Sequence, residues 1–205
     1  SAIPEHWLEE ARGRGLTAAR SATLPSVLFT PDDESQLVSV RAVDRDWPLR
    51  GEVELEAEPE PERLDRGPRP GKAWGDGALL LALDLEPGSP VQLGRQTLEF
   101  AREILLEPDR GSSLFDIAPR LMIHFDDLDR TGLIGPGSRV RYHFLAAGPP
   151  AAVEGLRGWL EIEMVPGQRL LDLEDANPEL RAAVNRARSF LGLASLMAVL
   201  LAGAA

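Results

Sequence analysis

The sequence predicts an α+β fold. Three observations lead to this prediction. A short helical stretch lies at residues 4–14, strand-like stretches separated by turn residues dominate as far as residue 148, and a helical pattern returns after residue 150. The chain has 205 residues, of which 43% are hydrophobic and 27% are charged. It is therefore long enough to bury a substantial core and has the composition of a folded protein.

The N-terminal part is predicted to begin with a helix and to continue with two strands. Pro4 suits the first turn of a helix, and Gly13 and Gly15 end it. Residues 16–30 and 36–43 have strand character, and the turn-forming sequence PDDES separates them. We therefore expect two strands joined by a turn.

Glutamate occupies every second position from residue 52 to residue 62. On a strand this spacing places the carboxylates on one face and Val53, Leu55 and Ala57 on the other. The prediction is a solvated strand that runs into an acidic, proline-rich linker. A divalent-cation site is the alternative, although carboxylates that run parallel along a strand do not converge on one ion.

A second group of elements is expected from residue 71 to residue 147. Residues 76–88 predict a short helix and a turn, and residues 89–109 predict a β-hairpin that turns at Gly94 and Arg95. Strands are predicted at 119–125 and 138–148, with a helical turn between them.

The C-terminal part is predicted to be mainly helical. Residues 151–164 have helical character, residues 168–175 resemble a strand, and Asn177 with Pro178 begins a helix that runs to the end of the sequence. From residue 189 to residue 205 no residue is charged. As a helix these 17 residues would extend about 26 Å, close to the ~30 Å hydrocarbon core of a bilayer.

The apolar character of this tail runs round the whole helix, whereas a helix on the surface of a domain keeps a polar stripe. This favours the beginning of a transmembrane helix, and a buried C-terminal core helix is the alternative. The residues expected at the point of membrane entry are Arg188, Phe190, Leu191, Leu196 and Leu200.

We find no motif for catalysis, metal binding or a cofactor. The net charge of −11 argues against a nucleic-acid partner, because phosphate binding needs clustered basic residues. The absence of cysteine excludes disulfides and thiolate chemistry. His6, His124 and His143 lack metal-ligand spacing, and the sequence DDLD at 126–129 suits the start of a helix better than a metal site.

Two short sequences come close to known motifs without matching them. GPRPGKA has three residues between its glycines, where a phosphate-binding loop has four, and Ala73 replaces the Ser or Thr that would bind the metal. No G-x-S-x-G sequence is present. We therefore do not expect an enzyme. An acid/base hydrolase that uses Asp109 or Asp116 is the weakest of the hypotheses.

Three stretches carry a family resemblance. In chain order they are LVSVRAVDRDWPLRGEVEL, LEPDRGSSLFDIAPRLMIHFDDLDRTGLIGPGSRVRYHFLAAG and DANPELRAAVNRARSFLGLASLMAVLLAG. Together they resemble the FtsX/MacB-like ABC transporter permeases, and among these the YbbP-type branch. The resemblance implies a MacB-like periplasmic core, which is a porter-like α+β base with an inserted, mostly β, sabre-like subdomain.

The resemblance also implies boundaries. Residues 1–56 would form the first part of the base and residues 57–149 the insertion. Residues 150–188 would form the second part of the base with a stalk helix, and residues 189–205 would begin the second transmembrane helix. The first base strand of the family has no counterpart in the sequence, which starts just after its expected position.

The function implied by the resemblance is that of an extracytoplasmic domain of a permease subunit in the bacterial inner membrane. A separate cytoplasmic ABC ATPase would hydrolyse ATP, and its motion would drive export or extraction of a hydrophobic or lipid-like substrate. The lipid bilayer would be a partner through the C-terminal helix, and a second permease copy or a periplasmic protein is a further candidate partner.

Leu114 and Phe115 are the predicted contact residues, because they form an apolar pair in a loop that follows the turn from Pro108 to Gly111. We expect this loop at the surface of the insertion, against a partner chain or the substrate. An ordinary loop folded back on its own domain is the alternative. For the whole chain, the alternative function is that of a soluble, non-catalytic binding or scaffolding domain with a buried C-terminal helix.

Overall fold

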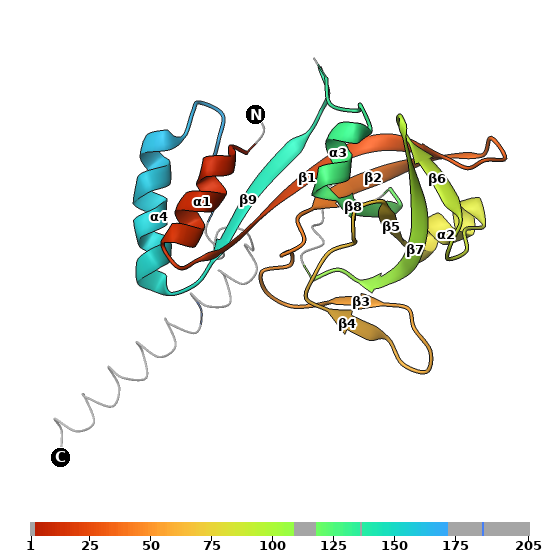
Figure 1. The fold of residues 1–205 in the computed structure, drawn as a ribbon, viewed down its shortest axis with the longest axis horizontal. Coiled ribbons are helices and arrows are strands. Elements are labelled where there is room, and N and C mark those ends of the chain that lie inside the picture. Colours follow the sequence, from red (N-terminus) through yellow and green to blue (C-terminus); the bar gives the residue numbers. More distant parts are fainter. Residues whose placement is uncertain (1–2, 109–117, 136, 172–185, 187–205) are drawn as a thin grey trace. The chain divides into compact units, whose positions relative to one another are not determined.

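Figure 1 shows the fold in a computed structural model, which describes residues 3–108, 118–135, 137–171 and 186. The helices in these residues are α1 (Glu5–Gly13), α2 (Gly77–Leu83), α3 (Phe125–Arg130) and α4 (Pro150–Glu163). The strands are β1 (Thr17–Phe29), β2 (Ser35–Val43), β3 (Val53–Leu55), β4 (Glu62–Leu64), β5 (Lys72–Asp76), β6 (Pro90–Leu93), β7 (Gln96–Leu106), β8 (Arg120–His124) and β9 (Arg141–Ala147).

The strands form one mixed sheet, whose order in the described residues is β4-β3-β7-β5-β8-β2-β1-β6. β9 also pairs with β1, and β6 also pairs with β7. The strands β7, β5, β8, β2, β1 and β6 therefore form a closed circuit of hydrogen-bonded neighbours. The pairs β2–β8 and β5–β7 are parallel and the other pairs are antiparallel.

One face of this circuit carries the larger hydrophobic core. Leu24, Val40 and Phe100 are among the strand residues buried in it, and Leu79 and Leu83 of α2 pack into the same cluster. α2 begins at Asp76, whose carboxylate accepts a hydrogen bond from the amide of Leu79 at 3.1 Å. This side-chain cap satisfies a backbone donor that the first turn of a helix leaves without a partner.

The other face carries a second core around two tryptophans. Trp47, from the segment between β2 and β3, is fully buried and packs with Trp74, Met122 and Leu55. The short hairpin of β3 and β4 lies beside β7 through pairing of β3 with β7. The sheet is thus covered on both faces, and the two cores hold it from opposite sides.

β9 and α1 both lie against β1. β9 runs antiparallel to the first half of β1, with Thr17 opposite Ala147 at one end and Thr23 opposite Arg141 at the other. Trp7 of α1 packs edge-on against Phe144 of β9, with 5.7 Å between the ring centroids. The aromatic contact fixes α1 on this strand pair (Figure 1).

Most of the predicted elements are confirmed. The structure contains the N-terminal helix, the two strands that flank PDDES, the hairpin at Gly94 and Arg95, and the helix that includes residues 151–163. The acidic stretch agrees with its prediction on β3, where Val53 and Leu55 are buried and Glu54 is not, and differs from it further on. β3 ends at Leu55, and the chain folds back as β4 so that Glu54 faces Arg63, with 2.7 Å between Oε1 and Nη2. Part of the stretch predicted to be a linker is therefore the second strand of a hairpin.

The predicted strand at 168–175 is wrong for residues 168–171, which form no strand, and its remaining residues lie outside the described part. The helix expected from Pro178 and the apolar tail lie outside it as well. Among the described residues, no helix combines the length and the apolar character needed to cross a membrane. By internal contacts the chain divides into two units, residues 1–156 and 157–205. The boundaries predicted at 56/57, 149/150 and 188/189 remain predictions.

Candidate functional site

The residues predicted to contact a partner or the membrane lie outside the described part of the chain. These residues are Leu114, Phe115, Arg188, Phe190, Leu191, Leu196 and Leu200, and the two aspartates of the hydrolase hypothesis, Asp109 and Asp116, lie outside it too. The structure does describe both ends of the loop that contains Leu114 and Phe115. The chain leaves β7 at Leu106, with Glu107 as the next residue, and returns to the sheet at Arg120, the first residue of β8.

A buried ionic cluster joins these two ends. The carboxylate of Glu107 accepts a hydrogen bond from Nε of Arg120 at 3.1 Å and contacts the guanidinium of Arg41 with its other oxygen. Only 1% of the Glu107 side chain and 2% of the Arg120 side chain are exposed. Because the pair is shielded from water, its electrostatic interaction is much stronger than that of a surface ion pair.

Neighbouring groups complete this cluster. Nη1 of Arg120 donates to the hydroxyl of Ser39 at 2.8 Å, and the guanidinium of Arg41 lies over the ring of Trp47, 4.7 Å from its centroid. Parallel pairing places Ser39 of β2 opposite Arg120 at the start of β8. The ends of the loop are therefore held by charge pairing to the centre of the sheet, and the loop begins and ends on a rigid base.

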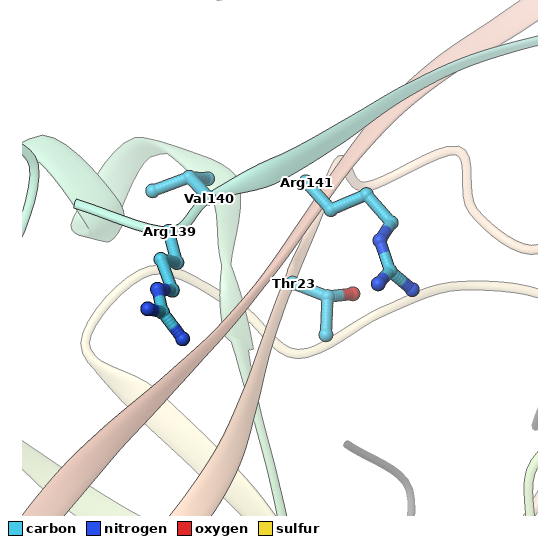
Figure 2. A pocket seen from close by; sticks show the side chains of 4 residues that line it. All are labelled: Thr23, Arg139, Val140 and Arg141. Atoms are coloured by element: carbon cyan, nitrogen blue, oxygen red, sulfur yellow. The ribbon is translucent and has the colours of Figure 1, made fainter. Parts of the chain in front are cut away.

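A hollow of about 250 Å³ lies nearby, where β9 leaves β1. It is lined by Thr23 of β1 and by Arg139, Val140 and Arg141 at the start of β9 (Figure 2). Thr23 is directly opposite Arg141 on one side and Arg41 on the other. Residues that face each other in antiparallel strands project to the same side of a sheet, so the hollow borders the row that contains Arg41.

Two groups near this region have shifted pKa values. Burial alone would lower the pKa of Arg20, but the hydrogen bond and charge of Asp44, with the charges of Glu5 and Asp126, raise it overall. Burial, and after it the charge of Asp129, raises the pKa of Tyr142 above its ordinary value of 10.0. Arg20 is thus fully charged and committed to an internal network, in which Nε lies 3.0 Å from Oδ2 of Asp44.

The short acidic stretch lies at the start of α3, as predicted, and its residues have distinct roles. Nδ1 of His124 caps the helix by accepting from the amide of Asp126 at 3.2 Å. Asp127 is fully buried, and its carboxylate accepts from the amide of Gly71 at 2.6 Å. In GPRPGKA, the backbone donor of Gly71 is therefore used by an internal carboxylate.

The described ranges contain no group of three or more His, Cys, Asp or Glu residues arranged to hold a metal ion. Local sequence patterns gave no signal for the Glu107 cluster or for the hollow, since each is assembled from distant strands. Arginine supplies the positive charge in both places. In the cluster it positions the two ends of the loop, and at the hollow it can recognise a ligand.

Sequence comparison finds a relative along nearly the whole chain. No protein-family model matches the sequence. Over 203 residues, or 99% of this chain, it is 36% identical to a protein of Escherichia coli (strain K12) described as an uncharacterized ABC transporter permease, YbbP. The matched region is 24% of that protein, so the chain spans about a quarter of its relative's length.

Comparison with solved structures finds the same fold in domains of two ABC transporters. The extracellular domain of the noncanonic ABC-type transporter YknZ from Gram-positive bacteria matches with a TM-score of 0.54 at 10% identity, over 79% of this chain and 84% of that one. The periplasmic region of MacB from Actinobacillus actinomycetemcomitans matches with a TM-score of 0.50 at 11% identity, over 76% of this chain and 73% of that one.

The fold is therefore that of the MacB-like extracytoplasmic domains of ABC transporters, and the α+β class predicted from the sequence is confirmed. By sequence, the chain is similar to a segment of an ABC transporter permease, YbbP, and the family resemblance is confirmed.

Proposed function

We propose that this chain is the extracytoplasmic domain of a permease subunit in the bacterial inner membrane, where it couples ATP-driven motion to the export or extraction of a hydrophobic or lipid-like substrate. ATP would be hydrolysed by a separate cytoplasmic ABC subunit. The observation that carries the proposal is the similarity to a permease along 99% of the chain, and the fold of the MacB and YknZ domains supports it.

In this proposal, motion reaches the domain through the helix predicted from Pro178 into the bilayer. An uninterrupted helix transmits displacement without a flexible joint, so a shift of the transmembrane segment moves the domain attached to it. The lipid bilayer is then a partner through residues 189–205, and the domain works beside a second permease copy or a periplasmic protein.

The loop between β7 and β8 is the proposed contact element. Its ends are fixed by the buried pair of Glu107 and Arg120, with 3.1 Å between Oε2 and Nε. Binding residues are often carried by loops that a folded scaffold holds at both ends, which supports a contact role for this loop. Leu114 and Phe115 would then meet the partner chain or the substrate.

The test is the double change Leu114→Ser with Phe115→Ser in the full-length permease. We expect ATP-dependent transport to fall, because apolar contacts are lost, while the melting temperature of the 205-residue chain stays the same. Leu81→Ser is a matched control, since Leu81 on α2 is 90% exposed and belongs to neither core. Normal transport by the double variant, or unfolding of the chain, would contradict the role given to these residues.

A further inference from the structure

We propose that the hollow between β1 and the start of β9 binds a phosphate group, supplied by the head group of an anionic lipid or by free phosphate. The donors are the guanidiniums of Arg139 and Arg141 and the hydroxyl of Thr23, which line the hollow from two different segments (Figure 2). The idea that the phosphate belongs to a lipid head group rests on the function proposed above, whereas the binding of phosphate does not.

The sheet leaves space for a ligand at this position. β9 pairs with β1 only from Thr17 to Thr23, and β6 pairs with β1 only at Leu28 and Phe29. In the described residues, the edge of β1 between these pairings has no neighbouring strand. Pro25 lies in this stretch and has no backbone N–H, which discourages a further strand from adding there. The space beside this edge of β1 is therefore not filled by another strand.

Charge makes the hollow suitable for an anion. Acidic residues outnumber basic residues by 33 to 22, yet Arg139 makes no hydrogen bond or ion pair in the described structure. Arg20 on the same strand pair shows the contrast, because it lies 3.0 Å from Asp44 and 2.8 Å from Glu5. Arg139 is an exposed residue and lines the hollow, so its guanidinium can pair with an incoming oxyanion.

The arrangement of donors favours phosphate over carboxylate. A carboxylate is planar and is satisfied by the fork of one guanidinium, whereas a phosphate offers acceptor oxygens in several directions. Arg139, Arg141 and Thr23 line the hollow from two segments, so their donors can approach a phosphate from more than one direction. The volume of about 250 Å³ is smaller than the roughly 300–1,000 Å³ of sites that enclose a drug-sized ligand, and it suits a head group.

The apolar wall agrees with an amphiphilic ligand. Val140 lines the hollow, and both Val140 and Tyr142 pack against the larger hydrophobic core. A phosphate held by Arg139 and Arg141 would leave the attached glycerol or acyl portion near Val140 and the solvent. The site would therefore orient a lipid by its charged end without enclosing its chains.

The first experiment titrates the 205-residue chain with inorganic phosphate and follows the arginine Nε–H signals by NMR, with chloride at equal ionic strength as reference. We expect saturable shifts that are lost at high salt, since exposed charge interactions are screened. Arg139→Gln should weaken binding at least about tenfold, because a charge-assisted hydrogen bond exceeds one tenfold step in affinity. Arg66→Gln makes the same change of charge at an exposed arginine between β4 and β5 and should leave binding unchanged.

Further variants keep the proposal falsifiable if a change at β9 disturbs folding. Thr23→Val removes the hydroxyl and keeps a β-branched side chain on the strand, so it should weaken phosphate binding without lowering the melting temperature. Absence of phosphate binding, or equal binding by the wild-type, Arg139→Gln and Thr23→Val chains, would overturn the proposal.

A second measurement separates the two sources of phosphate. Vesicles of phosphatidylglycerol that retain the wild-type chain but not Arg139→Gln, while phosphatidylcholine vesicles retain neither, would identify a lipid head group. Phosphate binding without vesicle binding would identify free phosphate. Because these assays need no permease, they stay distinct from the transport test of Leu114 and Phe115, whose failure would contradict the proposed function alone.

Discussion

Replacing Glu107 by glutamine should strongly destabilise the domain. The change keeps the size of the side chain and removes its negative charge, so the buried guanidiniums of Arg41 and Arg120 lose the carboxylate between them. Breaking a buried ion pair in this way costs about 3–5 kcal/mol. For a chain of this size the loss corresponds to a fall in melting temperature of roughly 6–20 °C, out of a typical total stability of about 5–15 kcal/mol.

Urea denaturation followed by circular dichroism measures this loss, with the free energy of unfolding taken by linear extrapolation. Glu99→Gln is the matched control, because Glu99 lies on β7, the strand that ends just before Glu107. Oε1 of Glu99 lies 2.5 Å from Nζ of Lys72, but the two side chains are 48% and 40% exposed. Because exposed pairs contribute only about 0–1 kcal/mol, this control should stay close to the wild type.

A companion variant tests whether charge, rather than packing, causes the effect. Simultaneous Arg41→Met, Glu107→Leu and Arg120→Met replaces the ionic cluster by apolar side chains, and such replacements are often neutral or stabilising. The triple variant should therefore be more stable than Glu107→Gln. If Glu107→Gln differs from the wild type by less than about 1 kcal/mol, the buried cluster does not hold the ends of the loop, and the reasoning is refuted.

Two further predictions concern single side chains. Asp127→Ala should cost about 1–3 kcal/mol in urea denaturation, because the amide of Gly71 loses a buried acceptor; an unchanged midpoint would contradict this. The raised pKa of Tyr142 predicts stability that is complete below about pH 10 and lost as the pH rises through the folded-state pKa, because tyrosine ionises first in the unfolded chain. Tyr142→Phe should be less sensitive to alkali, and tyrosinate absorbance reports on this residue alone, since the sequence has one tyrosine.

Local patterns were sufficient to predict most of the strands and helices. Alternation of apolar and charged residues predicted β9, where Val140, Tyr142 and Phe144 are more buried than Arg139 and Arg141. Gly94 and Arg95 marked the hairpin because a two-residue turn favours glycine, and Gly94 has a φ of 59° there. These signals lie within a few residues of one another.

The ionic cluster could not be predicted from such signals. Its hydrogen bonds join residues separated by 66, 13 and 81 positions, and the parallel pairing of β2 with β8 brings Ser39 to Arg120. No periodicity reports a contact of this range. In the sequence, Glu107, which directly follows β7, cannot be distinguished from an exposed glutamate. The MacB-like class likewise came from the resemblance of long stretches and not from the spacing of residues.

The pairing of β1 with β9 has a mechanical consequence. The start of β1 at Thr17 and the end of β9 at Ala147 lie opposite each other, and the hydrogen bonds between antiparallel strands run perpendicular to them. A force that separates the chain before Thr17 from the chain after Ala147 would break these hydrogen bonds one after another, beginning at the Thr17 end. The two flanking segments must therefore be displaced together if the sheet is to stay intact. A displacement shared by both segments is transmitted to the sheet, whereas a pull on one of them alone would separate β9 from β1.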